Sequence, residues 1–177
     1  RLSKFDRLTL LLSLGLAALM GLTWVVLVAA WEHHDEHQHF QVVRRLADGG
    51  EAAEQDFHLN RQILTSMIWN GFFTRLGPEP PLPPPGQMVF LPGYNQVGEP
   101  ALYYRLAAIP VRLLREENIT RQMYAARLVS WVLFLLTVLA AWGTARELVP
   151  SRHPAGRSSR QARITSYAER GDNRAPP

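Results

Sequence analysis

The sequence predicts an all-α membrane protein with two transmembrane helices and a helical extracytoplasmic loop domain between them. Residues 8–31 are 24 consecutive residues without a charged side chain. Residues 128–145 form a second uncharged stretch of 18 residues, bracketed by Arg127 and Arg146. Residues 32–127, which separate the two stretches, carry charged and apolar side chains in mixed order. Because only these two stretches are long and apolar enough to cross a bilayer, the rest of the chain belongs outside it.

The first apolar stretch is long enough for a tilted transmembrane helix. A helix rises about 1.5 Å per residue, so 24 residues exceed a hydrocarbon core of about 30 Å. Trp24 and Trp31 lie toward its far end, where indole rings favour the membrane interface. Val28 and Ala30 resemble a weak signal-peptide cleavage site. However, a signal peptide has an apolar core of only about 7–15 residues, so we expect a retained span.

The second apolar stretch is close to the lower length limit for a span. Arg127 and Arg146 can extend their charged groups to the two interfaces. The alternative is a buried helix of a soluble core. Leu, Val, Phe and Trp occupy all faces of residues 128–145, so a span is favoured. We expect Thr120 to cap the helix that leads into it.

Charge distribution predicts that both termini are cytoplasmic. Residues 1–7 carry three basic residues against one acidic residue, and the tail of residues 146–177 carries seven against three. The intervening 96 residues hold 9 basic and 11 acidic residues. The positive-inside rule therefore places that segment on the outer side. Since 18 of the 19 basic residues are Arg, a bias typical of GC-rich bacterial genomes, we expect a multi-pass protein of a bacterial inner membrane.

The loop domain is expected to contain three helices. Apolar side chains recur at helical spacing in residues 35–48, 51–76 and 100–115. The proline-rich residues 77–86 predict a stiff, non-helical connector. The third helix alternates apolar and Arg side chains, which suits either a helix on the membrane surface or a core helix of the domain. Three helices make a thin core, so the domain is expected to lean on the bilayer or on a partner.

The one cluster that can carry chemistry follows the first span directly, at residues 32–39. Closely spaced carboxylates and imidazoles can bind a divalent metal or act as a general base. The candidate metal ligands are His33, Asp35 and His37, of which the two histidines share a helix face. The alternative is a hydrated polar cap on the membrane helix. Zinc proteases space these residue types differently, and a chain without cysteine has no thiolate metal site and no disulfide.

Four segments together resemble the N-terminal module of GT-C membrane glycosyltransferases, which use polyprenyl-phosphate sugar donors. Residues 35–46 resemble the acidic motif after the first span of that family, and residues 99–104 resemble its Pro-Pro-Leu-Tyr-Tyr motif. Residues 124–130 and 145–150 resemble the start and end of its second span. The order and spacing of the segments match the branch that includes aminoarabinose lipid A transferases and protein mannosyltransferases.

The resemblance implies roles for specific residues. Asp35 would be the catalytic base and Glu36 its neighbour. Contacts with the substrate, a polyprenyl-phosphate lipid, would come from Glu99, Tyr103, Tyr104 and Arg127. The family has a basic or amide residue in place of Glu99, and a carboxylate there would repel a phosphate.

Two functions follow from these observations. The resemblance covers about residues 5–150, whereas family members continue into many more spans that enclose the donor site. We therefore expect a non-catalytic accessory subunit that packs within a larger membrane protein complex. The contacts would use the small residues of the first span, namely Gly15, Ala17, Ala18 and Gly21. The alternative is a GT-C transferase, or a fragment of one, that transfers sugar on the periplasmic face. The basic tail is expected to touch lipid or a partner subunit rather than nucleic acid.

Overall fold

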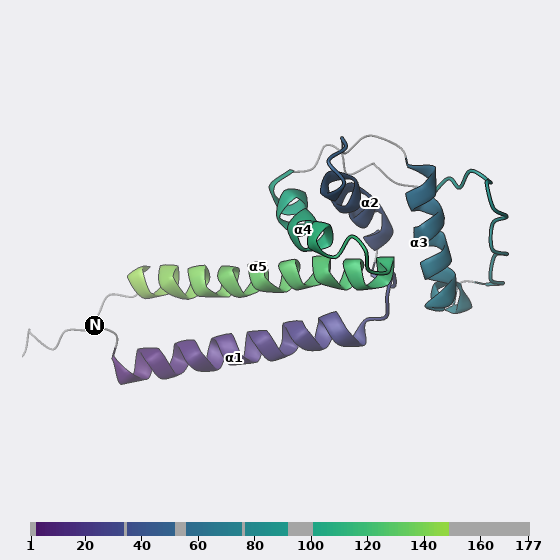
Figure 1. Cartoon of the computed structure of the whole chain (residues 1–177). Coiled ribbons are helices and arrows are strands. Elements are labelled where there is room, and N and C mark those ends of the chain that lie inside the picture. The colour runs from purple at the N-terminus through teal and green to yellow at the C-terminus, as the bar shows by residue number, and fades with distance from the viewer. Residues whose placement is uncertain (1–2, 34, 52–55, 76, 92–100, 149–177) are drawn as a thin grey trace, which may run out of the picture. The chain divides into compact units, whose positions relative to one another are not determined.

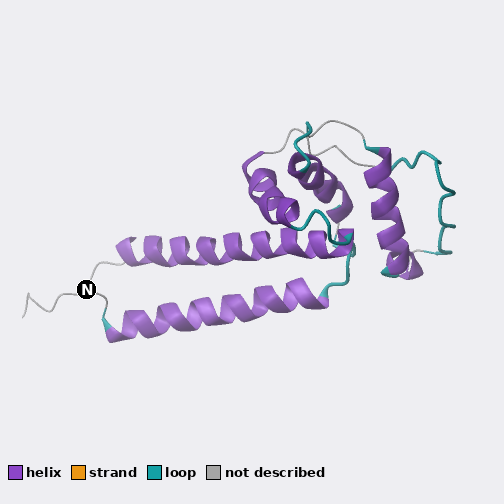
Figure 2. Cartoon of the chain, viewed as in Figure 1, coloured by secondary structure: helices purple, strands orange, loops and turns teal. Residues whose placement is uncertain are grey.

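Helices are the only regular secondary structure in the described part of the chain. A computed structural model describes residues 3–33, 35–51, 56–75, 77–91 and 101–148, and no strand occurs among them. Figures 1 and 2 show the elements along the chain. They are α1 (Lys4–Leu27), α2 (Glu36–Ala47), α3 (Phe57–Trp69), the 3-10 helix η1 (Phe72–Arg75), α4 (Ala101–Leu113) and α5 (Ile119–Leu148).

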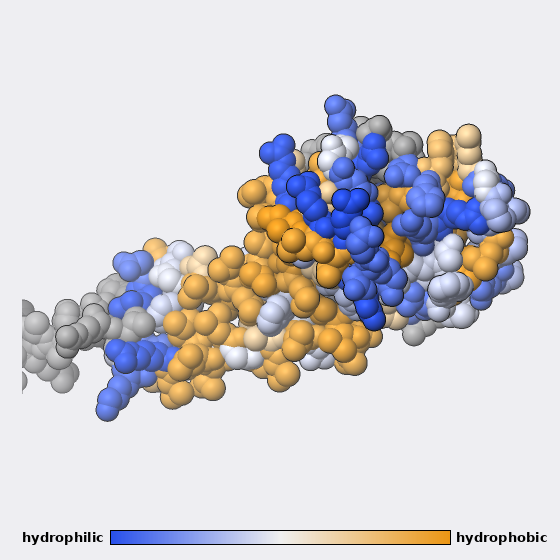
Figure 3. Space-filling view, viewed as in Figure 1, coloured by the Kyte–Doolittle hydropathy of each residue, from blue (hydrophilic) through white to orange (hydrophobic). Residues whose placement is uncertain are grey.

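Two of these helices, α1 and α5, are long and apolar enough to cross a membrane. Their large apolar side chains are mostly exposed, with Leu12 and Leu19 each 65% accessible. Figure 3 shows the apolar surface that covers both helices. An exposed apolar surface of this kind is unfavourable in water and favourable in hydrocarbon. The structure therefore agrees with the prediction of two candidate membrane-spanning helices.

Helix α1 begins and packs as its sequence dictates. The Ser3 hydroxyl accepts a hydrogen bond from the Asp6 backbone N–H, and the Asp6 carboxylate accepts one from the Ser3 N–H. This reciprocal cap provides acceptors for two backbone N–H groups that have no partner within the helix. Further along, α1 runs antiparallel beside α5 (Figure 1). The Trp131 indole on α5 donates a hydrogen bond of 3.1 Å to the Ala18 carbonyl on α1.

The contact of the Trp131 side chain with α1 depends on Gly21, which leaves room for the indole ring. A Cβ atom at this position would lie 2.5 Å from Cδ1 of Trp131. In contrast, a Cβ atom at Gly15 would meet nothing within 4 Å. Of the small residues expected to contact other subunits, Ala17 is buried within the chain and Ala18 and Gly21 contact Trp131, whereas Gly15 faces open space.

The helix of the first span has the predicted length of 24 residues but begins and ends four residues earlier than predicted. It ends at Leu27, and Trp31 lies beyond it with a left-handed backbone (φ 70°). The Trp31 side chain is fully buried, and its indole donates a hydrogen bond of 2.8 Å to the Ser66 hydroxyl on α3. Trp31 was expected at the membrane interface; instead it belongs to the core of the helical domain, by which we mean the described residues from 28 to 118.

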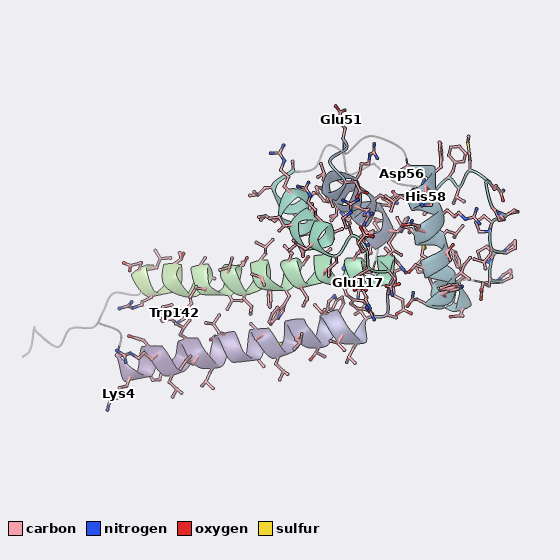
Figure 4. The ribbon with its side chains drawn as sticks, in the orientation of Figure 1. Lys4, Glu51, Asp56, His58, Glu117 and Trp142 are labelled. Carbon is pink, nitrogen blue, oxygen red and sulfur yellow. The ribbon has the colours of Figure 1, made fainter. Side chains whose placement is uncertain are left out.

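The predicted helices of this domain are observed with two differences. Helix α2 and helix α4 match residues 35–48 and 100–115 closely, and α2 packs mainly on α4. The helix predicted for residues 51–76 is observed only from Phe57, with a separate 3-10 turn after Trp69. Asp56 caps α3 by accepting hydrogen bonds from the backbone N–H groups of His58 and Leu59. Figure 4 labels Asp56 and His58 at this helix start.

The proline-rich segment is not helical, as predicted, and is fastened to α3. The Arg61 guanidinium donates hydrogen bonds of 2.6 and 2.8 Å to the carbonyls of Pro84 and Pro83. Phe90 packs edge-on against Phe57 at 4.8 Å between ring centroids. The segment that follows Gly77 therefore packs against α3.

Helix α5 starts directly after the helical domain and continues into the predicted second span. It begins at Ile119, and the Asn118 side chain accepts a hydrogen bond of 2.9 Å from the Arg121 N–H. The prediction that Thr120 caps this helix was wrong, because Thr120 lies inside it and its hydroxyl contacts that of Ser66. The chain divides into residues 1–140 and 141–177, and the described part of the second unit is the end of α5, where Arg146 lies over the Trp142 ring.

Candidate functional site

A cavity of about 730 Å³ lies where α1, α2, α4 and α5 meet. This volume is within the range of about 300–1,000 Å³ that is typical of ligand sites. Apolar side chains line most of it, and polar side chains gather where α2, α4 and α5 converge. The lining residues are Met20, Gly21, Trp24, Val25, His33, Glu36, His39, Phe40, Val43, Tyr103, Tyr104, Met123, Ala126, Arg127, Ser130, Trp131 and Phe134.

The Arg127 side chain holds the helices around this cavity together. Its Nε and Nη2 atoms donate hydrogen bonds of 2.5 and 2.7 Å to the two carboxylate oxygens of Glu36. Its remaining donors reach three backbone carbonyls at the end of the first span, those of Val25, Val28 and Ala29. A guanidinium has five N–H donors. All five therefore have an acceptor, and Arg127 joins α5 both to α2 and to the end of α1.

Both carboxylate oxygens of Glu36 also accept hydrogen bonds within the chain. Its Oε2 atom also accepts a hydrogen bond of 2.9 Å from the Trp31 backbone N–H. The Glu36 and Arg127 side chains are each only 11% exposed. Bidentate pairing of this kind is stronger and more directional than a single charged hydrogen bond. We call Glu36, Arg127 and the backbone groups they bind the clasp.

The backbone before α2 adopts an unusual shape that brings Glu36 to Arg127. Trp31 and Asp35 both have positive φ angles, 70° and 56°. Such angles are disfavoured for residues other than glycine, and most of all for a bulky residue such as Trp. They persist where the surrounding contacts fix them. Here the buried Trp31 indole and the clasp supply those contacts.

Two further polar pairs lie at the α4 side of the cavity. The Nδ1 atom of His39 lies 2.9 Å from the Tyr104 hydroxyl, and the two rings are stacked with centroids 6.0 Å apart. The hydroxyl of Tyr103 lies 2.9 Å from that of Ser130 on α5. These pairs give the apolar cavity a polar end, an arrangement suited to an amphipathic ligand.

The structure brings together most, though not all, of the predicted site residues. His33, Glu36, Tyr103, Tyr104 and Arg127 line the cavity. Two others, Asp35 and His37, precede and follow Glu36 but are not among the lining residues. Glu99 lies outside the described residues.

The predicted metal ligands do not converge. Among the residues that the structure describes, no group of three or more His, Asp or Glu side chains could hold a metal ion. His33 instead packs edge-on against Trp24, with centroids 6.2 Å apart. The polar cluster thus contributes to the cavity through His33, Glu36 and His39 rather than through a set of ligands.

Sequence reasoning did not single out His39, Ser130 or Trp131 as site residues. Ser130 had a visible signal, because a polar side chain in an apolar span often marks a functional or packing contact. His39 was one of several histidines in the cluster, and spacing alone does not show that it faces Tyr104. Trp131 is indistinguishable by sequence from a tryptophan that faces lipid.

Comparisons with known proteins leave the family open. The chain matches no protein-family model, no curated protein and no solved structure. The likeness to the GT-C module therefore stays a prediction from four short segments, three of which, at residues 35–46, 99–104 and 124–130, contribute described residues to the cavity.

Proposed function

We propose that the chain is a non-catalytic, two-span accessory subunit that packs within a larger complex of a bacterial inner membrane. Its helical domain lies on the periplasmic side and both termini lie in the cytoplasm. It resembles the N-terminal module of a GT-C glycosyltransferase in its segments, but uses them to hold helices together.

The observation that carries this proposal is the clasp. The family resemblance would give Glu36 a place beside the catalytic base and Arg127 a place at the lipid phosphate. Instead, the two side chains bind each other, and every guanidinium donor already has an acceptor. To bind a phosphate, Arg127 would have to give up hydrogen bonds that join α1, α2 and α5. A structural role accounts for this geometry without such a rearrangement.

The open face of α1 supports a role inside a complex. A Cβ atom at Gly15 would meet nothing within 4 Å, and Leu11 and Leu12 beside it are 67% and 65% exposed. Small residues allow close helix approach in membranes, where apolar burial alone gives little driving force between helices. We therefore assign this face to a neighbouring membrane helix.

The test is purification of the full, C-terminally tagged chain from its native membrane in a gentle detergent. The proposal expects one or more membrane subunits in fixed stoichiometry. Gly15→Leu should release them while leaving the thermal unfolding of the chain unchanged, because a side chain at position 15 points into open space. The proposal would be contradicted if the chain purified alone, or if the other subunits still purified with Gly15→Leu.

A second candidate is a GT-C type transferase or a part of one. It is favoured by the cavity, which collects side chains from both predicted motifs and from the start of the second span. In this function Asp35 would be the base that activates the acceptor. Asp35→Asn should then abolish sugar transfer from a polyprenyl-phosphate donor in membranes, whereas Glu51→Gln, an exposed change, should not. Retained transfer by Asp35→Asn would remove this candidate.

A further inference from the structure

Helix α4 has two apolar faces, and the helical domain uses only one of them. Its buried side chains pack into the core of the domain; they are Tyr104, Ala107, Ala108 and Val111. A second stripe, at Leu102, Leu106, Ile109 and Leu113, has the i, i+4, i+7 and i+11 spacing of a single helix face. At about 100° per residue this stripe lies opposite the buried face. Leu102, Ile109 and Leu113 are 70%, 58% and 80% exposed.

This exposed stripe is continuous with the apolar surface of the second candidate span. The Tyr103 hydroxyl, beside Leu102, lies 2.9 Å from the hydroxyl of Ser130 on α5. Ser130 is within the apolar residues 128–145, so the start of α4 lies at the level of that stretch. Figure 3 shows apolar surface running from the long helices onto the part of the domain where α4 lies.

The charges of α4 are all of one sign. Residues 101–113 contain two Arg residues and no acidic residue, whereas Arg115 follows the helix and forms an ion pair of 3.2 Å with Glu116. Arg112 donates hydrogen bonds of 2.8 and 3.0 Å to the carbonyls of Ala47 and Leu46, where it caps the end of α2. Arg105 and Arg115 are exposed. An apolar stripe flanked by Arg side chains has the chemistry of a helix at a lipid surface, where the cations meet phosphate groups.

We propose that α4 lies in the membrane–water interface, with Leu102, Ile109 and Leu113 inserted among lipid acyl chains. Arg105 reaches the lipid phosphates, and Arg112 fixes the helix to α2. The helical domain is therefore held against the bilayer by its own helix as well as by the two spans. This attachment is independent of whether the chain is an accessory subunit or part of an enzyme.

Spin labels on single cysteines test this attachment directly. The chain has no cysteine, so each variant carries one label in the full chain, reconstituted in vesicles of phosphatidylglycerol and phosphatidylcholine. The test positions are Leu102→Cys, Ile109→Cys and Leu113→Cys. The references are Leu16→Cys on the exposed face of α1 and Glu116→Cys, whose side chain is 90% exposed. Relaxation is measured with oxygen, which partitions into lipid, and with a water-soluble nickel chelate.

Each outcome has a distinct meaning. The proposal expects labels at all three α4 positions to collide often with oxygen and rarely with nickel, as at Leu16. Frequent nickel collisions, as at Glu116, would place the stripe in water and overturn it. Rare collisions with both reagents would mean that protein covers the stripe, which would also overturn it. Circular dichroism of each variant checks that the helices are intact.

Discussion

Replacing Arg127 by alanine should destabilise the protein more than any change at an exposed arginine. The substitution removes two hydrogen bonds to Glu36 and three to backbone carbonyls. It also leaves the Glu36 carboxylate, which is 11% exposed, without a cation. Breaking one side of a buried ion pair costs about 3–5 kcal/mol. Because Glu36 keeps the Trp31 N–H as a donor, we expect a loss near the lower end of that range.

Arg121 provides a matched control on the same helix. Its guanidinium bonds Glu117 at 2.6 Å, which is as short as the Arg127 contacts, but the side chains are 68% and 43% exposed. Exposed ion pairs contribute about 1 kcal/mol or less. Arg121→Ala should therefore cost under about 1 kcal/mol, although it removes the same side chain from the same α5.

The assay is reversible unfolding in detergent micelles, followed by far-UV circular dichroism and by tryptophan fluorescence. Arg127→Lys is informative as well, because lysine keeps the charge but cannot form the five-donor fork. We expect most of the loss to remain in this variant. If Arg127→Ala cost no more than Arg121→Ala, the clasp would not hold the helices together, and the reasoning from its geometry would be refuted.

Three further changes test the packing. Gly21→Ala should cost about 1–3 kcal/mol because its Cβ would lie 2.5 Å from Trp131, whereas Gly15→Ala, with nothing within 4 Å, should be neutral or stabilising in the same unfolding assay. Trp31→Ala should cost about 3–5 kcal/mol, since this fully buried side chain fills the core; a cost under about 1 kcal/mol would contradict its assignment. Asn118→Ala should cost about 1 kcal/mol through the lost helix cap, and an unchanged midpoint would argue against that cap.

Apolar length and periodicity predicted the helical elements well. The bounds of α2 were nearly right because Gly49 and Gly50 stop the helix and Phe40 and Val43 set its apolar face. The predicted helix start at residue 51 was wrong, because apolar spacing does not mark a helix end, whereas the cap residue Asp56 places the start at Phe57. Local signals therefore fixed the existence of helices better than their ends.

Hydrophobicity could not separate lipid from protein core. Trp31 continues the apolar run of the first span, yet it turns away from α1 and is buried in the helical domain. The clasp could not be predicted either, because Glu36 on α2 and Arg127 on α5 are 91 residues apart in the sequence. The charged residues were recognised as candidates, but their mutual pairing requires the fold.

The central claim is that α1 and α5 cross the membrane and place the helical domain opposite both termini. Because the chain lacks cysteine, single cysteines at Ser3, Glu51 and Ser158 can be labelled in intact cells with a membrane-impermeant maleimide. A tagged chain without cysteine is the background control. The account predicts labelling of Glu51→Cys from outside, and of the other two only after the membrane is opened. Equal labelling of all three sites in intact cells, or external labelling of a terminus, would contradict it.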